Sequence, residues 1–133
     1  GASFAPAYNH CAYEVADLDA VGAGNARLRA GGWAHAWGIG RHLLGSQIFD
    51  YWKDPWGAKH EHYADGDLFD SEHPTGYSPA GPKTLAQWGP PLPADFIDTR
   101  MTPALLASVV RGLRRYDEVT IARLVRMKRT LGG

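Results

Sequence analysis

The chain has 133 residues, of which 44% are hydrophobic and 21% charged, a composition typical of one globular domain with its own core. Lys plus Arg and Asp plus Glu each number 14, so the balance gives no reason to expect binding to nucleic acid or to a membrane. The single cysteine, Cys11, excludes an intramolecular disulfide and favours a reducing, cytoplasmic compartment. Residues 1–10 lack the basic and apolar regions of a signal peptide, so we expect none.

The first 66 residues predict five elements in the order β-α-β-β-β. Each expected strand alternates apolar and polar residues or is rich in aromatic and β-branched ones, and the expected helix begins at a good N-cap, Asp17, and stops at Gly31 and Gly32. The expected strands are residues 8–16, 32–40, 45–54 and 58–65, and the expected helix lies between the first two of them. A D-P-W-G turn joins the last two strands, with Pro and Gly at the positions that a β-turn favours.

Residues 66–100 form a long irregular stretch that contains six of the nine prolines and several aromatic residues. A segment of this length without regular structure usually covers a binding site, as a lid does. Two amphipathic helices are expected after it. Thr102 can cap the first, with Pro103 at its first position, while Asp117 can cap the second, which ends at Gly132.

The predicted fold class is therefore α+β. We expect a single βαβββ module in residues 1–66, an irregular lid segment in residues 67–101 and helices in residues 102–133. The helices carry seven of the 14 basic residues, which could serve a partner interface or simply form a solvated surface.

The strand alternation suggests a metal site. His10, Tyr51 and Glu61 can point to one face of a curved sheet, where His10 and Glu61 could converge on a metal ion. Two histidines and one carboxylate with open positions are typical of non-haem Fe(II). However, no compact motif links His10 to Glu61, and a half-buried strand histidine with a surface glutamate explains the same pattern. His60 and His62 flank Glu61 but point to the opposite face.

Three stretches carry a family resemblance: HCAYEVADLDAV, GRHLLGSQIFDYWKDPWGAKHEHY and QWGPPLPADF. Together they resemble the C-terminal part of a type I extradiol ring-cleavage dioxygenase, a family of the vicinal oxygen chelate superfamily, which is built from βαβββ modules. The resemblance includes a G-R-H turn, a tyrosine nine residues after His42, the D-P-x-G turn and a glutamate ten residues after Tyr51.

The resemblance implies a role for four residues. His10 and Glu61 resemble the family's metal ligands, and His42 and Tyr51 resemble catalytic residues that hydrogen-bond substrate or oxygen. The implied cofactor is Fe(II), with Mn, Ni or Zn as other candidates, and the implied reactants are a catecholic substrate and O2. Such a substrate binds the metal through two adjacent oxygens, and donors such as His42 and Tyr51 stabilise its anionic form.

The sequence departs from the family in one respect. The family takes another metal histidine and another pocket histidine from a preceding module, and this chain has neither. A missing N-terminal module or partner chain could supply them. Alternatively, a homo-oligomer could pair His10 and Glu61 from two copies, as in a homodimeric glyoxalase-like isomerase or lyase that uses Ni, Zn or Mn. A non-catalytic ligand-binding module is a third possibility.

Overall fold

A computed structural model of the chain describes residues 8–78, 81, 85–97, 102–116 and 119–131. These residues fall into two compact units, one that holds the five strands with the first helix and one that holds the last two helices. The elements are β1 (His10–Glu14), α1 (Leu18–Ala30), β2 (Ala34–His42), β3 (Ile48–Lys53), β4 (Lys59–Ala64), β5 (Ala86–Trp88), α2 (Pro103–Arg115) and α3 (Ile121–Leu131).

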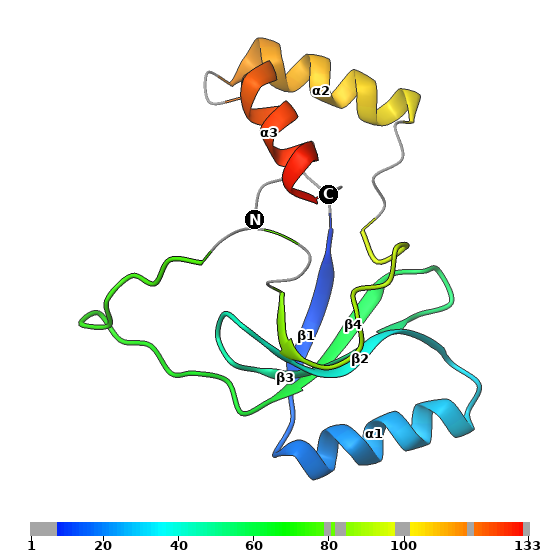
Figure 1. The fold of residues 1–133 in the computed structure, drawn as a ribbon. Coiled ribbons are helices and arrows are strands. Elements are labelled where there is room, and N and C mark those ends of the chain that lie inside the picture. The colour runs from blue at the N-terminus through cyan, green and yellow to red at the C-terminus, as the bar shows by residue number, and fades with distance from the viewer. Residues whose placement is uncertain (1–7, 79–80, 82–84, 98–101, 117–118, 132–133) are drawn as a thin grey trace. The chain divides into compact units, whose positions relative to one another are not determined.

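The strands form one sheet in the order β1-β4-β3-β2-β5. β1 is parallel to β4, and the other neighbouring pairs are antiparallel. α1 lies across one side of this sheet (Figure 1). The βαβββ order and the α+β class are thus confirmed, and the first and last strands of the module lie side by side.

Local capping explains the bounds of α1. The Asp17 carboxylate accepts a hydrogen bond of 2.8 Å from the backbone N–H of Ala20, and the Gly31 N–H donates to the Arg27 carbonyl. Both contacts satisfy backbone groups that a helix leaves unpaired at its ends. The predicted start and stop of this helix are confirmed.

The helix-facing side of the sheet is held by an apolar cluster and a buried carboxylate. Val21 of α1 packs on Ile48 and Ala64. Asp50, which is 0% exposed, accepts hydrogen bonds from Asn25 Nδ2 at 3.1 Å and from His35 Nε2 at 2.8 Å. The Trp52 indole N–H also donates to Asp50. These donors compensate for the burial of the negative charge and tie α1 to two strands.

Three details differ from the prediction. β2 continues through Arg41 and His42, so the expected G-R-H turn is the end of a strand, and the chain turns after it. A short strand, β5, lies within the stretch expected to be irregular. It forms by pairing with the edge of β2, and its three residues carry no strand pattern that the sequence alone could show. α3 is capped by Thr120, whose hydroxyl accepts from the Arg123 N–H, while Asp117 and Gly132 lie outside the described residues.

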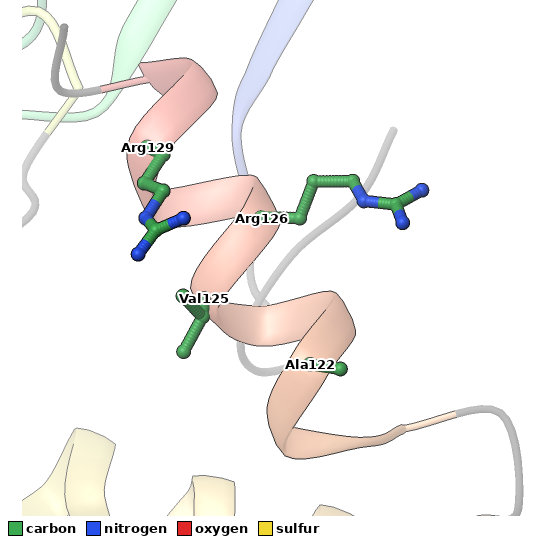
Figure 2. Close-up of a pocket in the computed structure, with 4 residues that line it drawn as sticks. All are labelled: Ala122, Val125, Arg126 and Arg129. Carbon is green, nitrogen blue, oxygen red and sulfur yellow. The ribbon is translucent and has the colours of Figure 1, made fainter.

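The second unit contains α2 and α3, and the predicted cap at Thr102 is confirmed by a 3.1 Å hydrogen bond from the Leu105 N–H. A hollow of about 530 Å³ lies against α3 and is lined by Ala122, Val125, Arg126 and Arg129. Figure 2 shows the two guanidinium groups extending to different sides of the helix. They do not converge, so this hollow presents no built anion site. No helix in the described part of the chain is long and apolar enough to cross a bilayer.

Candidate metal and substrate site

Side chains from four strands meet on the sheet face that is turned away from α1. His10 Nε2 of β1 lies 3.2 Å from Glu61 Oε2 of β4, and His42 Nε2 at the end of β2 lies 3.6 Å from Glu61 Oε1. Tyr51 of β3 pairs with Glu61 across the antiparallel ladder, and its hydroxyl lies 3.1 Å from His42 Nε2. The structure thus brings together all four residues that the sequence singled out, and it is the parallel pairing of β1 with β4 that brings His10 in.

Glu61 is the centre of this cluster. It is 4% exposed, and its Oε1 atom has no hydrogen-bond partner among the described residues. The Nδ1 atom of His10 is likewise buried without a partner in that part of the chain. Burying an unpaired carboxylate oxygen is costly, and a bound cation would remove that cost. An imidazole beside a carboxylate also has the donor chemistry that Fe(II), Mn(II) or Zn(II) accepts. The residues therefore fit a metal.

The metal set is not complete within the described residues. Across the described ranges, no group of three or more His, Cys, Asp or Glu side chains is placed to hold a metal ion. His42 Nε2 lies 3.6 Å from Glu61 Oε1, but its nearer contact is the Tyr51 hydroxyl at 3.1 Å. A metal bound between His10 and Glu61 would need at least one further protein ligand from elsewhere.

His42 is oriented by a residue that the sequence did not indicate. Its Nδ1 lies 3.0 Å from the Leu85 carbonyl oxygen, which can only accept, so Nδ1 carries a hydrogen. In the neutral ring, Nε2 is then the acceptor for the Tyr51 hydroxyl. Sequence patterns could not reveal this partner, because any residue can supply a backbone carbonyl.

Burial and charge act on the two donors differently. Burial lowers the pKa of His42, but the nearby Glu61 carboxylate and the contact of His42 with the Leu85 carbonyl outweigh it and leave the pKa raised. Burial is the largest cause that raises the pKa of Tyr51, and the neighbouring Glu61 carboxylate acts in the same direction. Tyr51 is therefore held as a neutral hydroxyl donor.

Aromatic rings pack beside the cluster, against Tyr51. Trp37 and Phe96 lie with ring centroids 5.2 Å apart, and both rings also pack on Tyr51. The segment after β5 is fastened to the sheet at two points: the Trp37 indole N–H donates to the Pro90 carbonyl at 2.9 Å, and Lys59 Nζ donates to the Phe96 carbonyl at 2.8 Å. This part of the expected lid segment therefore packs on the same sheet face as the four site residues.

The two histidines beside Glu61 lie on the other face, as the alternation predicts. His60 Nε2 lies 3.4 Å from Asp54 Oδ2, and His62 packs near Gly24 of α1. Neither contributes to the cluster around Glu61.

One known protein is similar to most of this chain. No protein-family model matches the chain. Metapyrocatechase 2 of Cupriavidus necator is 41% identical over 100 residues, a match that covers 71% of this chain and 30% of the relative. The chain thus spans less than a third of that relative's length.

Two solved structures share the fold. The crystal structure of BphC, a halotolerant catechol dioxygenase, matches with a TM-score of 0.55 at 22% identity and covers 67% of this chain and 29% of that one. The Mn(II)-bound glyoxalase from Novosphingobium aromaticivorans matches with a TM-score of 0.58 at 30% identity and covers 71% of this chain and 33% of that one. The chain is a module of the type I extradiol dioxygenase family, within the vicinal oxygen chelate superfamily.

Proposed function

We propose that the chain is the metal- and substrate-binding part of an Fe(II)-dependent extradiol dioxygenase that cleaves a catecholic ring with O2. The observation that carries this proposal is the meeting of His10, His42, Tyr51 and Glu61 on one sheet face, in a chain 41% identical to a metapyrocatechase. The substrate and the reaction come to this chain from that similarity.

His10 and Glu61 would hold the metal. Their buried unpaired atoms, His10 Nδ1 and Glu61 Oε1, support this role. When bound, Fe(II) would supply a Lewis acid with open positions for both reactants. The low exposure of Glu61 keeps its carboxylate away from bulk water, which strengthens its attraction for a cation.

His42 and Tyr51 would bind and orient the substrate. The Tyr51 hydroxyl is a fixed donor, and His42 Nε2 can accept a proton or, once protonated, donate one, because Nδ1 remains bonded to the Leu85 carbonyl. A catechol losing a proton on binding would find an acceptor in His42 and a donor in Tyr51. We also propose that the lid segment, through Phe96, restricts water near these groups.

The proposed site needs a contribution from outside the described residues. A preceding module, in the same polypeptide or on a partner chain, would supply the third metal ligand. The chain covers 30% of Metapyrocatechase 2, so most of the relative has no counterpart in these 133 residues.

A glyoxalase-like activity is the second candidate. It is favoured by the match to a Mn(II)-bound glyoxalase, which has a TM-score of 0.58 at 30% identity. Two copies of the chain would then complete one site with two histidines and two glutamates, and Mn(II), Ni(II) or Zn(II) would be the expected metal.

Oxygen uptake tests the proposal. The full chain would be supplied with Fe(II), catechol or 2,3-dihydroxybiphenyl, alone and together with a chain that carries the preceding module of an extradiol dioxygenase. We expect uptake with a yellow ring-fission product in the complemented sample, and its loss in Glu61→Gln. Absence of product in every pairing would contradict the dioxygenase, and purification as a dimer loaded with Mn or Ni would favour the second candidate.

A further inference from the structure

A second cavity lies between α1 and the sheet, on the face opposite to the cluster around Glu61. Its volume is about 290 Å³. Ring and aliphatic side chains from five segments line it, together with Lys53 and Asp54: Tyr13, Leu28, Trp33, Trp52, His60 and His62. This volume is near the lower end of the range of about 300–1,000 Å³ that small-molecule pockets occupy, which suits a single ring with short substituents.

The backbone of α1 lies close to the sheet beside the cavity. A Cβ on Gly24 would lie only 3.2 Å from the His62 ring, so the helix backbone approaches the sheet closely at that point. α1 ends at Ala30, and the chain turns at Gly31 and Gly32. Rings at that end of the sheet line the cavity.

One lining ring is buried and fixed in place, whereas two others are half exposed. Trp52 is 4% exposed, and its indole is held by the hydrogen bond to Asp50 and by the Arg29 guanidinium, 5.9 Å from the ring centroid. Trp33 and Tyr13 are 50% and 52% exposed, and Tyr13 stacks on His60 with an angle of 10° between the rings. Such ring faces attract a flat aromatic molecule more than an aliphatic one of the same size.

The two charged residues that line the cavity, Lys53 and Asp54, are already compensated. The Asp54 carboxylate accepts from the backbone N–H groups of Trp56 and Ala58 and contacts His60. Lys53 Nζ is paired with Asp95 at 2.9 Å. The cavity therefore does not favour an ion of either sign, and a neutral ligand fits it best.

Two polar groups nevertheless remain for a ligand. Neither the His62 imidazole nor the Trp33 indole N–H has a hydrogen-bond partner within the described part of the chain. The imidazole can donate or accept, and the indole N–H can only donate. A hydroxyl group on an aromatic ring could satisfy one or both of them.

We propose that this cavity is a second binding site, independent of any metal, for a neutral single-ring aromatic molecule that carries a hydroxyl group. It goes beyond the proposed dioxygenase function, because none of its lining residues contributes to the cluster around Glu61. Ligand binding there would bridge α1, β1, β3 and β4 and so stabilise the folded chain.

The test uses the full chain, stripped of metal with a chelator, and phenol as the probe. Isothermal titration or ligand-observed NMR would measure the affinity, with cyclohexanol as a non-aromatic probe of similar size. Trp33→Ala and His62→Ala remove lining groups. The matched control is Trp56→Ala, because Trp56 is 89% exposed and does not line the cavity. Tyr51→Phe controls for binding on the opposite sheet face.

We expect saturable binding of phenol, at least tenfold weaker binding in Trp33→Ala, and binding unchanged in Trp56→Ala and Tyr51→Phe. Cyclohexanol should bind more weakly than phenol. Intermolecular NOEs from phenol to Trp33 and His62 in the unmodified chain give the same information without any variant. Absence of saturable binding would overturn the proposal. A loss in Tyr51→Phe but not in Trp33→Ala would also overturn it, while leaving the proposed dioxygenase function intact.

Discussion

His10 Nε2 lies 3.2 Å from Glu61 Oε2, although the two residues come from the first and the last strands of the βαβββ module. β1 pairs with β4 in parallel, with Ala12 opposite Glu61, so His10 and Glu61 lie on the same face of neighbouring strands. Among the described residues, neither His10 Nδ1 nor Glu61 Oε1 has a hydrogen-bond partner, although both atoms are buried.

Replacing a proposed metal ligand should weaken metal binding. Loss of a residue that only supports a metal ligand lowers metal affinity by about 10–100-fold. We expect His10→Ala or Glu61→Gln, which remove a ligand itself, to lower the affinity for Fe(II) or Mn(II) by more than that. Equilibrium dialysis with metal analysis measures the change. His60→Ala is the matched control, because that histidine neighbours Glu61 in sequence but contacts Asp54 on the other face. Full affinity in both ligand variants would refute the assignment.

Removing the Tyr51 hydroxyl should weaken substrate binding without affecting the metal. In the proposed site the Tyr51 hydroxyl donates to the substrate, and loss of one such hydrogen bond costs about 1 kcal/mol, or about fivefold in affinity. We expect Tyr51→Phe to bind catechol more weakly in the metal-loaded, complemented protein, as measured by titration calorimetry. Tyr77→Phe should behave as the unmodified chain does, because Tyr77 is exposed. Equal losses in the two variants would contradict the role of Tyr51.

The buried Asp50 should stabilise the fold without serving the proposed site. Asp50→Ala leaves the donors of Asn25, His35 and Trp52 without their acceptor, so we expect the free energy of unfolding to fall by at least about 2 kcal/mol. Urea denaturation measures this change. Asp19→Ala, in the first turn of α1, should change stability by less than about 1 kcal/mol. A similar small effect at Asp50 would show that water replaces its contribution.

Two glycine substitutions should change the stability of the folded chain in opposite directions. Gly38 has φ of +129°, and a Cβ there would lie 2.9 Å from the Asp50 Cα, so Gly38→Ala should destabilise the chain by about 1–3 kcal/mol. Gly22 lies inside α1 with open space around a new Cβ, so Gly22→Ala should stabilise it by about 0.5–1 kcal/mol. Thermal unfolding of the two variants checks both signs, and equal shifts would contradict the strain at Gly38.

The local part of this fold follows from patterns that lie within a few residues. The alternation along β3 and β4 places Tyr51 and Glu61 on one face and His60 and His62 on the other, because side chains of a strand change sides at every residue. The cap at Asp17 likewise depends only on the first turn of its helix. Such features need no knowledge of the rest of the chain.

Tertiary structure decided the contacts between distant segments. The pairing of β1 with β4 brings His10 to Glu61, the Leu85 carbonyl orients His42, and β5 forms only because the edge of β2 is available to it. His35 carried no motif, yet it is one of the donors that compensate the buried Asp50. These contacts join residues far apart in the chain, and their partners include backbone atoms that every residue type carries. A sequence pattern therefore determines which face a side chain occupies, while only the packing of the strands determines what that side chain meets.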